Sequence, residues 1–218
     1  MGIPKCVIFG LLFGVLFGIA IQGLLGLEFF PRYSMTLEEM LRIFLLNSLL
    51  ATVLAFGGTI FSIIEVRFHS YGRVYKTLDK TVNPLYFILK RFSPEYEKLG
   101  TLWRSLYLAS FFPLVCLFLI AFVIGLFLTA FLLASQDIGF FLKLLPHISL
   151  ELLAFSYAAK TGLEANKKLE KQIFRKDINS FRSEAGKLLK SGKSWKRILV
   201  VCSLLLLAAV LERIFVGF

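Results

Sequence analysis

Long apolar runs are the feature that most constrains this chain. A helix needs about 20 predominantly apolar residues to cross the hydrocarbon core of a bilayer. Runs of that kind occupy residues 6–30, 41–64, 106–134, 140–162 and 198–218. We therefore predict an all-α, polytopic membrane protein, a bundle of about five transmembrane helices formed by residues 1–218 as a single domain.

The fourth run, 140–162, has the weakest apolar character. Lys143, His147, Glu151 and Lys160 interrupt it, although most of the other residues between 144 and 159 are apolar. The first run follows Lys5 and is much longer than the ~7–15 residues of a signal-peptide core. We therefore count both as membrane spans and expect the first to remain uncleaved.

Composition supports a lipid environment. The 218 residues are 57% hydrophobic, whereas soluble domains are about 45–50% apolar. The net charge of +11 fits cytoplasmic loops beside anionic lipid better than nucleic-acid binding. Cys6, Cys116 and Cys202 are odd in number and lack metal-type spacing, so neither a disulfide framework nor a metal site is expected.

Basic residues cluster in two of the predicted loops. Segments 65–105 and 164–197 are rich in Lys and Arg. The connections 31–40 and 135–139 together contain a single basic residue, Arg32. Loops rich in Lys and Arg stay on the cytoplasmic side of a membrane. We predict a multi-pass protein of the cell membrane with its N-terminus cytoplasmic and its C-terminus extracytoplasmic.

The second basic loop contains an amphipathic pattern. Its apolar positions recur at steps of three and four residues, with basic residues between them, up to Ser191 and Gly192. These positions are Phe174, Ile178, Phe181, Ala185 and Leu188. The pattern predicts a basic cytoplasmic helix that either lies on the inner leaflet or packs beneath the bundle.

Small and polar side chains indicate which helix faces pack together, because lipid already satisfies apolar ones. Gly10, Gly14 and Gly18 form a ridge of small residues on the first helix. The second helix has a similar stripe, made of Asn47, Ala51, Ala55, Gly58, Ser62 and Glu65. Both stripes are expected to face neighbouring helices.

The fourth run combines ionisable and small residues on one face. His147, Glu151, Ala154, Ala158 and Gly162 follow one another by three or four residues. We predict that Asn47, His147 and Glu151 converge in the outer half of the membrane as a polar site. The competing interpretation is a set of structural hydrogen bonds between helices. Glu212 and Arg213 are expected to extend to the membrane interface.

These motifs resemble a known family. The segment Phe44-Leu45-Leu46-Asn47, the pair Gly57-Gly58, and the segment from Pro146 through His147 to Glu151 with its following small residues are similar to the stage II sporulation protein M (SpoIIM) family, also called DUF95. Ile148 stands where that family has glycine. The resemblance implies about five membrane helices and an action alongside partner proteins of the cell envelope.

Two functions are compatible with these features. The first is a noncatalytic scaffold or assembly partner of a membrane complex. The alternative is a small oligomeric transporter or ion or proton channel that uses Asn47, His147 and Glu151, with the glycine ridge joining its copies. An enzyme is not expected, because His147 and Glu151 lack a third metal ligand and no nucleophile motif accompanies them. No cofactor is expected; the partners are the lipid bilayer, a membrane or cell-envelope protein and further copies of the chain.

Overall fold

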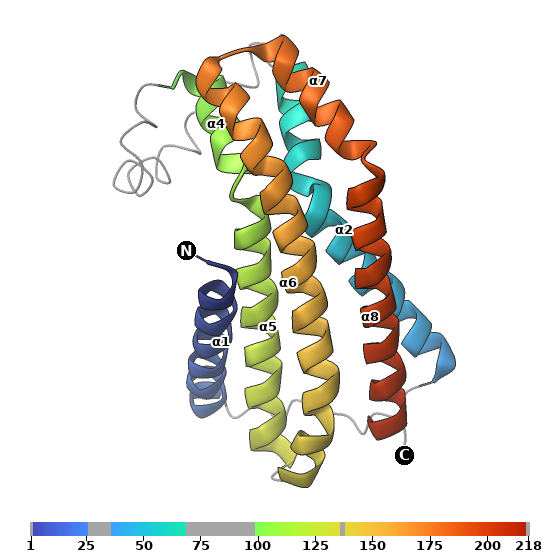
Figure 1. Cartoon of the computed structure of the whole chain (residues 1–218). Helices are drawn as coiled ribbons and strands as arrows, with labels where there is room; N and C mark the ends of the chain where they lie inside the picture. Colours follow the sequence, from blue (N-terminus) through green and yellow to red (C-terminus); the bar gives the residue numbers. More distant parts are fainter. Residues whose placement is uncertain (1, 26–35, 69–98, 136–137, 217–218) are drawn as a thin grey trace.

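The computed structural model describes residues 2–25, 36–68, 99–135 and 138–216, which fold into helices with no strand among them (Figure 1). The helices are α1 (Ile3–Leu25), α2 (Leu37–Phe68), α4 (Thr101–Ala109), α5 (Phe112–Ser135), α6 (Ile138–Arg175), α7 (Ile178–Leu189) and α8 (Gly192–Val216). The predicted all-α class is confirmed. Most of the first basic loop, residues 69–98, lies outside the described residues.

Four of the described helices are long and apolar enough to cross a membrane. These stretches are Ile3–Ile21, Leu37–Arg67, Phe112–Thr129 and Gly192–Phe215. Large apolar side chains on them point away from the protein; Leu16 is 65% exposed and Leu199 is 67% exposed. Such a surface belongs in lipid, so the chain is a membrane protein.

The fifth predicted span lies within α6. This helix is not among the four, because Lys143, Glu151 and Lys160 reduce its apolar character. It nevertheless runs beside α5 and α8 through the same layer of the bundle (Figure 1). A fifth crossing therefore stays a prediction, which the position of α6 between apolar helices supports.

The predicted start of the third span at residue 106 is wrong. Leu106 belongs to the short helix α4, and α5 begins only at Phe112. Between them, the backbone N–H groups of Ser110 and Phe111 bond to carbonyls three residues back. Pro113 has no N–H to donate, so it fits the first turn of a new helix better than the interior of a continuous one.

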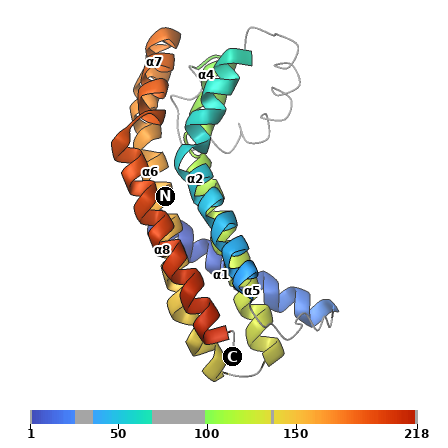
Figure 2. The ribbon, with the colours of Figure 1, turned by 90° about the vertical axis from the view of Figure 1, so that its right-hand side faces the viewer.

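The glycine ridge of α1 lies against α5, the helix with which α1 makes its main contact (Figures 1 and 2). A Cβ on Gly14 would lie 2.1 Å from the carbonyl oxygen of Phe122, and one on Gly10 would lie 2.7 Å from that of Phe118. Only glycine permits so close an approach of the two backbones. An oligomer joined through this ridge does not fit, because α5 already covers it.

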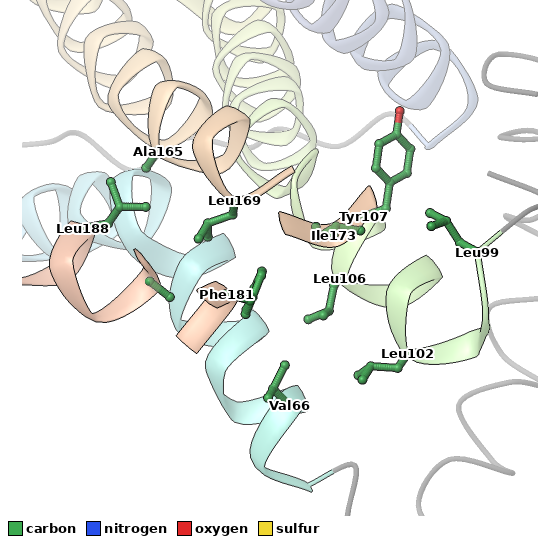
Figure 3. Packing of buried hydrophobic residues seen from close by; sticks show 11 residues of the cluster. Val66, Leu99, Leu102, Leu106, Tyr107, Ala165, Leu169, Ile173, Phe181 and Leu188 are labelled. Atoms are coloured by element: carbon green, nitrogen blue, oxygen red, sulfur yellow. The ribbon is translucent and has the colours of Figure 1, made fainter. Parts of the chain in front are cut away.

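A second hydrophobic core lies at the end of the bundle that carries α7. At ~1.5 Å per residue, the 38 residues of α6 extend for about 57 Å, well beyond a hydrocarbon core of about 30 Å. The excess packs with α4, α7 and the end of α2 (Figure 3). We call this unit the end module; its core comprises Val66, Leu99, Leu102, Leu106, Tyr107, Ala165, Leu169, Ile173, Phe181, Ala185 and Leu188.

The amphipathic segment, residues 174–188, is predicted to lie either on the inner leaflet or beneath the bundle, and its packing in the end module distinguishes the two. Phe181, Ala185 and Leu188 are buried against other helices of the protein, so α7 packs on the bundle and does not present this face to lipid. The segment is also not one helix. Phe174 belongs to α6, which ends at Arg175, and the chain turns at Lys176 with a φ of 55°.

Asp177 caps the helix that follows this turn. Its Oδ1 accepts hydrogen bonds from the backbone N–H groups of Asn179 and Ser180, and its Oδ2 accepts one from the Ser180 hydroxyl. These bonds, first of all the one from the Ser180 side chain, lower the pKa of the Asp177 carboxyl. The ionised cap therefore stabilises α7 above the pKa that Asp177 has when unfolded, and this stabilisation is lost as the pH falls through the folded pKa.

We expect acidification below about pH 4 to increase amide exchange in α7, after correction for the pH dependence of intrinsic exchange. Asp177→Asn keeps an oxygen for the cap but has no carboxyl to protonate. Hydrogen exchange of residues 178–189 against pH checks the prediction. An equal acid response in the Asp177→Asn protein would contradict it.

Candidate intramembrane polar site

The predicted site residues come from two helices. Asn47 lies in the first third of α2, while His147 and Glu151 lie one turn apart near the start of α6. Both positions are toward the end of the bundle where α8 finishes, opposite the end module (Figure 1). α2 and α6 run in the same direction, so polar residues at similar distances from the two helix starts lie at the same level (Figure 1).

These side chains contact one another directly. Asn47 Nδ2 donates a hydrogen bond to Glu151 Oε1. His147 is buried, and its Nδ1 lies 3.1 Å from the carbonyl oxygen of Ala208 on α8. His147 Nε2 lies 3.7 Å from Glu151 Oε2 and 3.6 Å from Glu212 Oε2. The cluster therefore joins α2, α6 and α8.

Glu212 is a member of the cluster that sequence reasoning missed. The expectation that it extends to the membrane interface is wrong, since its side chain is only 19% exposed and its Oε2 is buried. A signal was present: Leu205, Ala208 and Glu212 follow one another by three and four residues, and the first two are buried. A face that is buried at two successive turns also carries its third residue inward.

Arg213, the next residue of α8, is exposed. Its extension to the membrane interface stays a prediction. The two adjacent charges thus point to different surroundings.

Small residues on the same face of α6 continue the contact with its neighbours. Ala154 and Ala158 are fully buried. A Cβ on Gly162 would lie 2.5 Å from the carbonyl oxygen of Leu54 and 2.9 Å from Cγ of Pro113. The stripe that begins with two ionisable residues therefore ends in close packing against α2 and α5.

One turn further on, Asn166 forms a second polar contact that sequence reasoning missed. Its Nδ2 donates to the carbonyl oxygen of Ser110 at 3.0 Å, and its Oδ1 lies 3.4 Å from the Thr59 hydroxyl. A Cβ on Gly58 would lie 2.7 Å from its Nδ2. Asn166 follows Gly162 by four residues, so extending the stripe by one step would have found it.

The described residues contain no group of three or more His, Cys, Asp or Glu side chains arranged to hold a metal ion. Cys6, Cys116 and Cys202 are free thiols. Cys6 is buried, and its Sγ lies 3.1 Å from the carbonyl oxygen of Leu114, to which it donates. The polar cluster itself brings together one amide, one imidazole and two carboxyl groups, from Asn47, His147, Glu151 and Glu212.

Exposed basic side chains surround the end module. They come from the end of α6, from the turn after it, from α7 and from the start of α8, and comprise Lys167, Lys168, Lys171, Arg175, Lys176, Arg182, Lys187, Lys190, Lys193 and Lys196. The polar cluster and this basic surface therefore lie at opposite ends of the bundle (Figure 1).

Comparison of the chain with protein-family models, with curated proteins and with solved structures finds no match. The resemblance to the SpoIIM family accordingly remains a prediction from the motifs around Asn47 and His147.

Proposed function

We propose that this protein is a noncatalytic scaffold of a membrane complex, similar in role to the SpoIIM family. One observation supports this most directly: a basic surface stands outside the apolar belt on an end module with its own packed core. Fixed helices present charges without a large ordering cost when a partner binds. An acidic surface of a partner protein is the complementary chemistry.

The proposed topology places the end module in the cytoplasm. The positive-inside rule favours this side for its many basic residues. Trp195 supports a membrane boundary at the start of α8, since tryptophan is enriched at such interfaces. Its ring lies 4.9 Å from that of Phe56, and its Nε1 donates to the Leu189 carbonyl at 2.8 Å. The polar cluster then lies in the outer half of the membrane.

Within a scaffold, the polar cluster holds the bundle together. Asn47 links α2 to α6, and His147 links α6 to α8. Hydrogen bonds between membrane helices stabilise their association by about 1 kcal/mol each. Such links keep the end module at a fixed position relative to the membrane.

Removing basic charges from the end module should abolish partner binding. We expect Lys167→Gln, Lys168→Gln and Lys171→Gln together to reduce the recovery of a stoichiometric partner in mild detergent at least tenfold, because charge complementarity is lost. Seven of the ten exposed basic residues of the end module remain, so most of the positive charge that sets the topology is kept. In-cell crosslinking followed by detergent isolation measures the effect.

The matched control removes three charges at the other end through Arg42→Gln, Lys143→Gln and Arg213→Gln, and it should leave partner recovery unchanged. Repeated isolation of the wild-type protein alone after crosslinking would contradict the scaffold proposal. Equal loss of the partner in both triple variants would contradict the role of the end module.

A second candidate function is a proton-linked or cation transporter. The position of Glu212 favours it, because two carboxylates and an imidazole now meet within the bundle, and ionisable groups in membranes are commonly functional. Proteoliposomes containing a pH-sensitive dye would reveal proton flux, and a flux lost in Glu151→Gln would favour transport over the scaffold.

A further inference from the structure

The contact between His147 and Ala208 fixes the hydrogen on one ring nitrogen. Nδ1 lies 3.1 Å from a backbone carbonyl oxygen, which can only accept a hydrogen bond. Nδ1 therefore carries the hydrogen. In a neutral imidazole the other nitrogen, Nε2, then has a lone pair and can only accept.

With the hydrogen on Nδ1, a neutral ring places the Nε2 lone pair beside two carboxylate oxygens, which is unfavourable unless the cluster takes up a proton. Nε2 faces one oxygen of Glu151 and one oxygen of Glu212, at 3.7 and 3.6 Å. With both carboxylates ionised and the imidazole neutral, three acceptors would face one another with two negative charges in a largely buried cluster. Uncompensated charge of this kind is costly away from water. A proton on Nε2 makes the ring an imidazolium, which places a positive charge beside both oxygens and halves the net negative charge of the three groups.

Within the described residues, no other charged group forms an ion pair with this cluster. The groups that act electrostatically on Glu151 are His147 and Glu212, with Asn47 as a hydrogen-bond donor from α2. The nearest basic residues along the three helices, Arg42, Lys143 and Arg213, are exposed. Compensation therefore comes from protons taken up by the cluster itself.

We propose that His147, Glu151 and Glu212 form a proton-binding site, in which a proton on Nε2 gives an imidazolium that lies between the two carboxylates and holds the last part of α8 against α6. The proton comes from water at the nearby membrane surface. Glu212 lies four residues before the end of α8, or about 6 Å along the helix axis, and its side chain is partly exposed. Loss of the proton leaves Glu212 facing a lone pair and a second carboxylate, which pushes α8 away.

The proposal can be tested by nitrogen NMR of His147. The chain has two histidines, so His69→Gln leaves His147 as the only ring to observe. The full-length protein, with ¹⁵N-labelled histidine, is placed in phosphatidylcholine nanodiscs at pH 7. We expect shifts typical of N–H at both ring nitrogens. In Glu151→Gln/Glu212→Gln, Nε2 should show the shift of a bare nitrogen while Nδ1 stays protonated.

Glu38→Gln serves as the control, because Glu38 is an exposed carboxylate in the first turn of α2 at the same end of the bundle. It should leave both nitrogen shifts unchanged. A bare Nε2 in the protein with both carboxylates would overturn the proposal. A protonated Nε2 in the double variant would overturn it as well.

The coupling to α8 has its own readout, which does not need the double variant to fold. We expect Glu212→Gln to raise amide hydrogen exchange of residues 205–215 at least tenfold at pH 7, because the imidazolium of His147 loses its charged partner on α8. Raising the pH of the wild-type protein until Nε2 becomes bare should have the same effect, after correction for the pH dependence of intrinsic exchange. Unchanged exchange in both cases would show that the proton does not hold the helix.

Discussion

Phe181→Ala is expected to lower the free energy of unfolding of the end module by about 3–5 kcal/mol. The Phe181 ring is fully buried and lies in the core formed with Val66, Leu106 and Leu169 (Figure 3). Alanine would leave a cavity that four packed helices cannot easily close. Since α7 has only 12 residues, it depends on this packing and should detach first. Chemical unfolding in mild detergent, with hydrogen exchange over α7, measures the loss.

Phe174→Ala is the matched control, because it removes the same side chain from the edge of the module. Phe174 is 36% exposed and contacts the Tyr107 ring edge to face at 5.6 Å between ring centroids. Its loss should destabilise the protein by about 1 kcal/mol, the usual contribution of an aromatic pair. Equal effects of the two substitutions would contradict the structure of the end module.

Gly14→Ala is expected to displace α1 from α5. The new Cβ would lie 2.1 Å from the carbonyl oxygen of Phe122 and 2.9 Å from the amide nitrogen of Leu126, both backbone atoms that cannot turn aside. Overpacking usually destabilises by about 1–3 kcal/mol, and a backbone clash belongs at the upper end of that range. The remaining helices should stay folded, because α1 packs mainly on α5.

Labelling of Cys6 reports this displacement. Cys6 is buried on α1, and its thiol donates to α5, so a small maleimide should react at least tenfold faster in Gly14→Ala when Cys116 and Cys202 are replaced by alanine. Gly186→Ala is the control: nothing lies within 4 Å of its new Cβ, and it should stabilise α7 by about 0.5–1 kcal/mol. Unchanged labelling in Gly14→Ala would contradict the close contact between α1 and α5.

The buried faces of the helices could be predicted from small and polar residues. In lipid, apolar side chains do not distinguish a buried face from an exposed one. In an apolar solvent, small and polar residues mark where helices meet. That argument selected Gly14, Gly162 and Asn47, and each of them lies against a neighbouring helix. Residue type and periodicity together sufficed, since each stripe of small and polar residues recurs at steps of three or four residues.

The identity of the neighbour could not be predicted in the same way. Nothing in the spacing of Gly10, Gly14 and Gly18 distinguishes α5 from a second copy of the chain. Glu212 was missed because a charge near a helix end usually reaches water. Its inward direction depends on the rotation of α8, which is set by the packing of Val201 and Leu205 against other helices.

The helices α2 and α6 are also longer than the predicted spans, with 32 and 38 residues. Apolar runs mark the part of α2 and α6 that lies in lipid, but α6 continues to Arg175 as a polar helix with one buried face. Leu169 and Ile173 are buried there only because α4 and α7 cover them. The local pattern indicated the apolar face of α7, but this core joins segments far apart in the sequence, so the pattern could not identify the helices that cover that face.

The dependence of α1 on α5 has a consequence for the order of events during synthesis. About ninety residues separate the two helices along the chain, which takes on the order of 5–20 seconds to translate. During that interval α1 is in the bilayer without α5, and lipid tails contact its glycine ridge. Assembly of this pair is therefore a late step, in which those tails leave as the two backbones come together.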